Sequence, residues 1–406
     1  MHTPLQTEWL EIARNQAEER YRSLPLPTAK DEAFRFTPIA DLDSNGGETG
    51  GAVGLELSTL DPEEAALLLL NGEEASLQGS APGLVFTDLL KAVTLGIDHV
   101  RARLRDSAAV FAGDKFAQLS SARWRNGAFL HVPAGVKVAK PLRAATAVTD
   151  SEEHSRFLIV LEEGAEATFV QESWSPEGDR LATELTEVRL GKNSKLHWVQ
   201  VQRYGSGTKA MVRQHVELGE GSDLKITPIH LGAGKIQVRQ EIVLSGEGSQ
   251  VEVEGAARGS GNQHFDFWMD IDHAASRTKS QTNFWFVMGD ASRSIFNGLI
   301  HIRKHAQDCE AGQRAKSLLL GTKATVHAIP KLIIQTDAVK CAHGASVSSV
   351  NPEQVHYLQS RGISKPEAER MIVRGFTEPV LVRLPTEELQ ARAEAALDRK
   401  QGGLLQ

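Results

Sequence analysis

Apolar and polar residues alternate in short runs through the middle of the chain, from about residue 128 to residue 349. In the run FDFWMDID at 265–272, residues 265, 267, 269 and 271 are apolar, while Asp266, Asp270 and Asp272 belong to the other set. Strict alternation places the two sets on opposite faces of an extended strand. This region is therefore expected to consist of short β-strands joined by glycine-containing turns.

The turns recur at a nearly constant spacing. Gly164, Gly191, Gly219 and Gly246 are separated by 27, 28 and 27 residues, which is the recurrence expected when the rungs of a solenoid stack on one another. A sandwich of antiparallel hairpins also has regular glycine turns, so the pattern favours the solenoid but leaves both folds open. The next turn glycine, Gly289, follows after 43 residues, which predicts an insertion or an irregular rung.

Helical periodicity predicts helices at both ends of the chain. At the N-terminal end these are a helix over 1–25, a helix that is capped at 61–64 and runs into 67–70, and a helix or helix pair over 86–104. At the C-terminal end, capping residues and first-turn prolines predict helices over 353–360, 366–374 and 386–399. The predicted architecture is mainly helical at 1–127, a β core at 128–349 and helical at 350–406.

Composition and charge argue against several classes of protein. The 406-residue chain has a formal net charge of −7 with acids and bases interspersed, which is unlike a nucleic-acid-binding surface. Its longest apolar run, at 65–70, is far shorter than the ~18 residues that a membrane span needs, and the first residues lack an apolar signal core. Two cysteines in a chain of this length indicate a reducing compartment. A cytoplasmic location is therefore expected.

The two side chains with the clearest chemistry are Cys341 and His343, which lie one residue apart at the end of a β-prone run. On a strand, residues i and i+2 point to the same face, so the thiol and the imidazole can serve one ion or one partner surface. Thiolate and imidazole both suit iron and zinc. The alternative is a buried cysteine beside a histidine that bonds a backbone carbonyl. Two ligands do not close a metal site, so a metal function would need ligands from elsewhere.

Other candidate metal ligands are weaker. His301 and His305 have the spacing of a helical metal pair, but their surroundings predict a strand, where ~3.3 Å per residue places them roughly 13 Å apart. They are expected to be surface residues. The group Asp266, Asp270, Asp272 and His273 lacks the glycine of a calcium loop, and the acids are expected to line a solvated strand face.

No P-loop, dinucleotide fingerprint or nucleophile elbow occurs in the chain. The second candidate site is instead the C-terminal helical part, where Ala368, Met371, Ile372 and Phe376 fall near one stripe of a helix. A helical module that follows a solenoid is expected to cap its end or to dock a partner.

Several runs of the chain resemble the SufB/SufD family of iron–sulfur assembly proteins. The most specific are VKCAHGA at 339–345, YLQSRGI at 357–363 and MIVRGF at 371–376. The resemblance continues in LPTAKDEAFRFT at 26–37, HVPAGVKVAKP at 131–141, IVLEEGA at 159–165, FNGLI at 296–300 and the run from 313 to 320. It thus extends over nearly the whole chain, and it is stronger to the SufD branch than to the SufB branch.

The resemblance implies a right-handed parallel β-helix with helical domains at both ends, acting as a non-catalytic scaffold of the Suf complex. It implies pairing with SufB through the β-helix, docking of the SufC ATPase by the C-terminal helices, and a homodimer as an option for the isolated chain. His343, with Cys341 beside it, matches the histidine at the shared assembly site, where an iron–sulfur cluster is transient and is not held stably by this chain alone. The residues implied in partner binding are Tyr357, Arg361, Met371, Ile372 and Phe376.

Two other functions stay open at this stage. SufB-type chains carry a functional cysteine just before a Ser-Leu-Leu run, and Ala315 takes its place here. This difference favours SufD, although a SufB-like subunit that holds the cluster itself remains an alternative. The alternative from another class is a β-helix carbohydrate-active enzyme that uses strand-face carboxylates such as Asp266 and Asp270.

Overall fold

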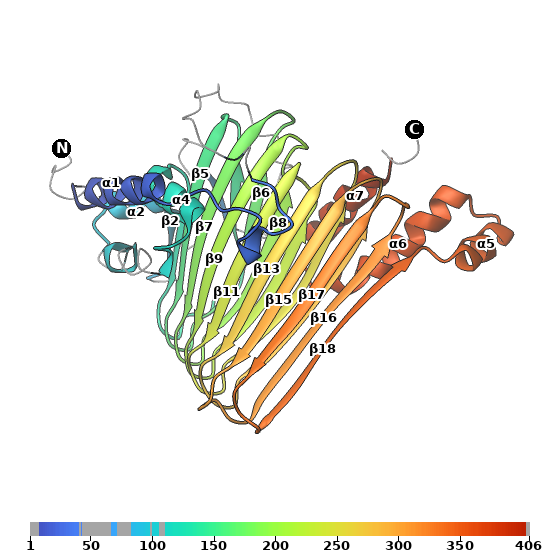
Figure 1. Cartoon of the computed structure of the whole chain (residues 1–406). Coiled ribbons are helices and arrows are strands. Elements are labelled where there is room, and N and C mark those ends of the chain that lie inside the picture. Colours follow the sequence, from blue (N-terminus) through green and yellow to red (C-terminus); the bar gives the residue numbers. More distant parts are fainter. Residues whose placement is uncertain are drawn as a thin grey trace.

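The computed structural model describes residues 8–39, 42, 66–70, 83–97, 100–104 and 110–402. Its centre is a parallel β-solenoid whose two walls are nine-stranded sheets, here called sheet A and sheet B (Figure 1). Sheet A contains, in spatial order, β1 (Ala66–Leu70), β4 (Leu142–Ala147), β6 (Glu166–Trp174), β8 (Lys195–Arg203), β10 (Asp223–His230), β12 (Gln250–Gly259), β14 (Lys279–Met288), β16 (Cys309–Leu319) and β18 (Val339–Ser349). Sheet B contains β2 (Val85–Asp88), β3 (Ala128–Val132), β5 (Glu152–Leu161), β7 (Arg180–Leu190), β9 (Thr208–Leu218), β11 (Lys235–Leu244), β13 (His264–His273), β15 (Arg293–Ile302) and β17 (Thr325–Ile334).

The chain alternates between the two sheets, so each strand lies beside the strand two elements away in sequence. Neighbouring strands are parallel except for the pair β2 and β3. The solenoid prediction is therefore confirmed, and the sandwich of antiparallel hairpins is wrong. The predicted irregular rung after Gly246 is also wrong, because Gln250 pairs directly with Lys279 of the next turn. Gly289 belongs to the β14–β15 turn, whereas Gly246 belongs to a β11–β12 turn, so the two glycines mark different kinds of turn.

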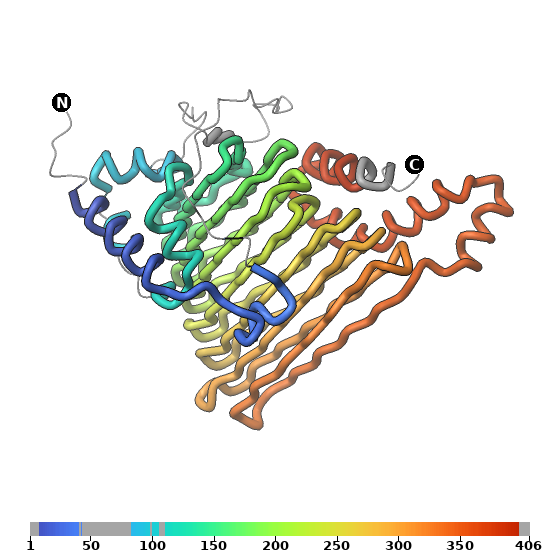
Figure 2. The backbone as a smooth tube through the Cα atoms, turned by 45° about the horizontal axis from the view of Figure 1, so that its top comes forward, coloured from blue at the N-terminus to red at the C-terminus, as the bar shows by residue number. Residues whose placement is uncertain are grey.

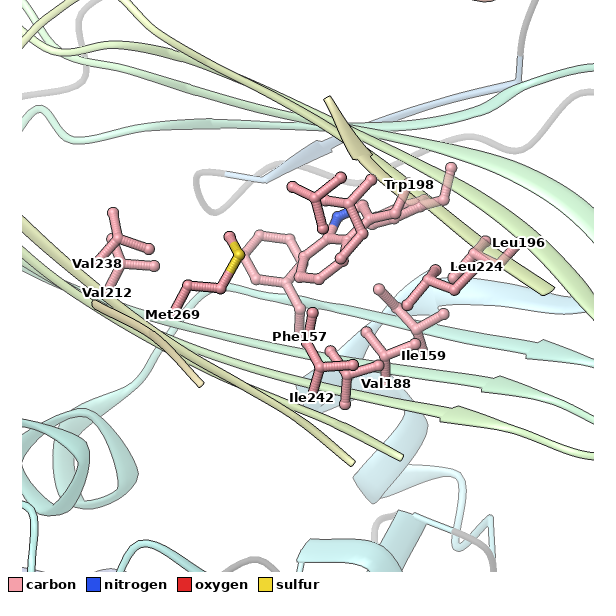
Figure 3. Close-up of a cluster of buried hydrophobic side chains, with 14 of the residues drawn as sticks. Phe157, Ile159, Val188, Leu196, Trp198, Val212, Leu224, Val238, Ile242 and Met269 are labelled. Carbon is pink, nitrogen blue, oxygen red and sulfur yellow. The ribbon is translucent and has the colours of Figure 1, made fainter. Parts of the chain in front are cut away.

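The inward-facing rows of the two sheets form the hydrophobic core. Trp198 of β8 lies opposite Phe157 of β5, and Leu196 and Leu224 occupy adjacent positions of one row (Figure 3). Further along, the rings of Phe284 and Phe286 stack with centroids 5.0 Å apart. Because each row packs between its neighbours and the opposite sheet, every turn depends on the next one for burial.

The N-terminal helices cover the outer face of sheet B. They are α1 (Glu8–Ser23), the short 3₁₀ helix η2 (Glu32–Phe34), α2 (Leu89–Thr94) and α4 (Lys115–Arg123), with a further helical stretch at 100–104. Asp114 caps α4 and its carboxylate accepts a hydrogen bond of 2.6 Å from Arg213 of β9. This ion pair, nearly all of it buried, fixes the helices to the solenoid.

One helix prediction in this region is wrong, and the helix pair predicted over 86–104 is confirmed except for its first residues. Residues 67–70 belong to strand β1, which pairs in parallel with β4 and so adds to sheet A. The expected cap at 61–64 lies outside the described residues. Residues 85–88 form β2, and helix α2 begins only after Asp88, whose carboxylate accepts a hydrogen bond from the backbone N–H of Lys91. In both places sheet pairing outweighs the local preference for helix.

The C-terminal helices pack beside the solenoid, on the outer face of sheet A. They are α5 (Pro352–Ser360), α6 (Lys365–Leu381) and α7 (Glu387–Gly402), and α6 continues past its expected end with Pro379 inside it. Val199, Ile229 and Trp285 of sheet A pack against apolar residues of α6 and α7. These helices therefore do not cap the last turn, which is a correction to the first of the two expected roles. Figure 2 shows α5 and the start of α6 projecting beyond the solenoid. No helix of the described part is both long and apolar enough for a membrane span.

The dependence of each turn on its neighbours gives a direct test. Leu224→Ala removes a fully buried side chain from the core, so the free energy of unfolding should fall by about 2–5 kcal/mol. Leu95→Ala is the matched control, because Leu95 is 64% exposed and should change that free energy by no more than ~0.5 kcal/mol. Urea unfolding followed by circular dichroism measures both. Equal effects of the two substitutions would contradict this packing.

Candidate functional site

The last turn of the solenoid is formed by β17 and β18, which end sheets B and A. Each pairs on one side only, β17 with β15 and β18 with β16, and no described residue forms a strand on the other side. Their 10 and 11 residues leave a long edge of backbone N–H and C=O groups available for pairing. Ile333, Ile334 and Val347 are 46%, 41% and 52% exposed there. No further turn of the described chain therefore covers the apolar side chains of the last turn.

Cys341 and His343 lie in the inward-facing row of β18. In the register with β16, Cys341 pairs with Ala311 and His343 with Gln313, and both partners are buried. The same row is largely exposed in β18, because no further turn covers it. The structure therefore places the thiol and the imidazole on one face, as predicted, at the open end of the core.

The environment of Cys341 is mostly apolar. Its side chain joins a cluster that includes Cys309, Ala311 and Leu332. Burial raises the pKa of the Cys341 thiol, the nearby Cys309 raises it further, and a hydrogen bond from the backbone of Ala311 acts in the opposite direction. The thiol is thus held in its neutral form near neutral pH, and a metal or a cationic partner would have to favour the thiolate.

Gln313, which pairs with His343 in the register of the two strands, has no role predicted from the sequence. It is 3% exposed, and its amide nitrogen Nε2 has no hydrogen-bond partner among the described residues. The amide lies so close to Gly298 of β15 that a Cβ atom there would be 1.8 Å from Nε2. An unpaired buried donor costs stability, so this amide is an unsatisfied group of the core next to the last turn. Gln313 and His343 lie in register because β16 pairs with β18. No local sequence motif connects them.

The five residues expected to bind a partner separate into two groups. Tyr357, Arg361 and Met371 are exposed, and the guanidinium of Arg361 lies over the ring of Tyr357, 5.4 Å from its centroid. Ile372 and Phe376 pack against apolar residues of sheet A and are only partly exposed. The first group is accessible on α5 and α6, and the second anchors α6 to the solenoid.

The histidine pair His301 and His305 does not form a site. His301 lies 3.8 Å from Asp272, whereas the imidazole of His305, in the turn after β15, lies 2.8 Å from the carbonyl oxygen of Ala274. Within the described ranges no group of three or more His, Cys, Asp or Glu side chains is arranged to hold a metal ion.

The carboxylates of β13 differ from the expected solvated face. Asp266 is only 2% exposed, because the N-terminal segment crosses sheet B and the Thr37 hydroxyl donates to its carboxylate. Asp270 accepts a hydrogen bond of 2.8 Å from the Trp268 indole. Four residues along one strand place Asp266 and Asp270 about 13 Å apart, beyond the separation that glycoside hydrolysis needs. His273 faces inward instead, where it binds Thr278 and Ser280. Asp266 and Asp270 therefore do not form the carboxylate pair that this alternative named.

The raised pKa of Cys341 predicts slow alkylation. Because burial favours the neutral thiol, the pH at which iodoacetamide modification reaches half its maximal rate should lie above that of a cysteine in a short peptide. Mass spectrometry of the folded chain over a pH series measures this rate. The Cys341→Ser variant is the control, since the fully buried Cys309 should stay unmodified. A midpoint at or below that of the peptide would contradict the described environment.

Comparison with known proteins identifies the family of this chain. Residues 144–376, more than half of the chain, match the family model described as "SUF system FeS cluster assembly, SufBD core domain". The chain is 30% identical to the iron–sulfur cluster assembly protein SufD of Bacillus subtilis, over 97% of this chain and 94% of that protein. It is 28% identical to SufB of the same organism, over 76% of this chain and 67% of that protein. A SufBD family protein of Staphylococcus saprophyticus is 28% identical over 94% of this chain and 87% of its own length. This chain therefore belongs to the SufB/SufD family of iron–sulfur cluster assembly proteins.

Proposed function

We propose that this chain is a SufD-type scaffold subunit of a cytoplasmic Suf assembly complex, without catalysis of its own. It pairs with SufB through the edge of β17 and β18, docks the SufC ATPase with its C-terminal helices, and contributes His343 to a shared assembly site. The observation that carries the proposal is the uncovered last turn, which has both an unpaired edge and the Cys341–His343 pair.

Pairing through this edge follows from the physics of sheets. A strand added to β18 or β17 supplies hydrogen bonds to the free backbone groups. A partner that is itself a solenoid also covers the exposed side chains of Ile334 and Val347, and removing this apolar surface from water favours the complex. SufB, which has the same family fold, satisfies both conditions. A second copy of this chain satisfies them too, which fits a homodimer of the isolated chain.

In that arrangement His343 lies at the junction between the two subunits. Its exposed imidazole offers one nitrogen to iron, and Cys341 offers a sulfur only once its proton leaves. Since two ligands do not complete an iron or cluster site, the remaining ligands come from SufB. The iron–sulfur cluster is then cargo that is assembled between subunits.

The second contact uses the projecting part of α5 and α6. Tyr357, Arg361 and Met371 form its accessible surface, and large aromatic, arginine and methionine side chains are typical of interface centres. Ile372 and Phe376 connect this surface to sheet A. Movement of α6 driven by ATP hydrolysis in SufC would thereby be transmitted to the solenoid.

The first test separates chemistry from assembly. His343→Ala should leave co-purification with SufB and SufC intact, because the side chain is exposed and supplies no edge hydrogen bond, while cluster formation by the complex should fall at least tenfold. Visible absorption after anaerobic reconstitution measures the cluster. His305→Ala is the control, as it removes a surface histidine in the turn after β15. Loss of association in His343→Ala alone would show that the residue is structural.

The second test concerns the helices. Met371→Glu places a charge in the exposed surface of α6, so it should weaken binding of SufC at least tenfold and leave binding of SufB unchanged. Ile12→Glu is the matched control, because Ile12 is an exposed apolar residue of α1. Pull-down of each partner measures the two interactions. Retention of SufC by Met371→Glu would exclude this surface.

A further inference from the structure

A groove lies on the outer face of sheet A, on the side that α6 and α7 leave open. It has a volume of about 1140 Å³ and is lined by residues of β10, β12, β14, β16 and β18. This volume is near the upper end of the range for small-molecule sites. We propose that the groove binds a small, multiply charged oxyanion, which is a polyphosphate or a polycarboxylate.

The charge of the groove differs in sign from that of the chain. The chain has a formal net charge of −7, yet the groove lining contains five cationic side chains and three carboxylates. The cations are Lys225, Lys279, Arg314, Lys316 and Lys340, and the carboxylates are Asp223, Glu252 and Glu310. A local excess of positive charge in an acidic protein concentrates anions at that point.

The cations are also poorly neutralised. Lys279 and Lys340 share one carboxylate, Glu310, at 3.6 and 3.7 Å. Glu252 is already paired with Arg383, 2.8 Å away on the other side. No carboxylate of the described residues lies within ion-pair distance of Arg314 or Lys316, and the Lys316 ammonium lies 5.7 Å from the centroid of the Trp285 ring instead. Two of the unpaired charges, Arg314 and Lys316, therefore lie together on β16.

The floor of the groove leaves space above these charges. On β18 the positions in register with Gly312 and Arg314 are Ala342 and Gly344, so the strand carries only small side chains or none at these two positions. A Cβ atom built on Gly344 has no neighbour within 4 Å. The guanidinium of Arg314 and the ammonium of Lys316 are thus free to approach one ligand from the same strand.

This combination selects the ligand chemistry. A guanidinium binds phosphate or carboxylate oxygens in bidentate fashion, and neighbouring ammonium groups add charge without directional demands. The same groove repels free divalent cations such as Fe²⁺. Because exposed cations are screened by salt, a singly charged anion gains little here and a multiply charged one gains more. The proposal does not depend on the identity of the partner subunits.

Calorimetry on the isolated chain tests the proposal, with inorganic pyrophosphate and citrate as separate probes at low and moderate salt. Binding of either probe is expected, and the probe that binds identifies phosphate or carboxylate as the preferred group. The double variant Arg314→Gln and Lys316→Gln should weaken binding of that probe at least tenfold. The control carries Lys304→Gln and Lys323→Gln, two exposed lysines in turns, and should stay within twofold of the unmodified chain.

A steric variant makes the test independent of charge. Gly344→Leu fills the open space on a strand position whose backbone accepts any residue, so it should abolish binding while circular dichroism and the melting temperature stay unchanged. No binding of either probe by the unmodified chain would overturn the proposal. So would an equal loss in the Lys304 and Lys323 control, because that result would show only non-specific attraction.

Discussion

A solenoid buries the apolar row of each turn against the next turn, and the last turn has no successor. Within the core, Leu196, Leu224 and Val251 form one continuous row of buried side chains. The inward-facing residues of the last strand, β18, include Cys341, His343 and Val347, and no described element covers them. A free strand edge and exposed apolar groups are costly for an isolated protein. The free edge and the exposed apolar side chains at this end of the solenoid are the reason for proposing that it pairs with another subunit.

The helices at the two ends of the chain leave that end open. The N-terminal helices and the following segment cover sheet B, and Asp114 and Asp266 bind them through buried polar contacts. The C-terminal helices cover sheet A, where the buried carboxylate of Glu172 accepts a hydrogen bond of 3.0 Å from Arg392 of α7. Both outer faces are thus partly occupied, while the edge and the groove beside it stay accessible. One strand, β18, contributes both the Cys341–His343 pair and part of the lining of the groove.

The repeat structure and the extent of its main part, from Ala128 to Ser349, could be read from the sequence, but the strands β1 and β2 could not. Gly164, Gly191, Gly219 and Gly246 all lie in the turns that lead from sheet B to sheet A, which is why their spacing was regular. The next such turn, 274–278, has no glycine, so the sequence suggested an irregularity that does not exist. The strands at 66–70 and 85–88 were missed because their pairing partners lie far away along the chain. For the site, the shared face of Cys341 and His343 followed from strand periodicity. The burial of Asp266 and the position of Gln313 required the tertiary register.

The proposed function requires that the edge of β17 and β18 is the surface that pairs with SufB. Hydrogen exchange of the chain, alone and mixed with SufB, tests this most directly. If the edge pairs with SufB, backbone amides of 325–334 and 339–349 gain protection from exchange in the mixture, while those of β5, β7 and β9 do not change. Protection confined to the N-terminal helices or to the outer face of sheet B would contradict it.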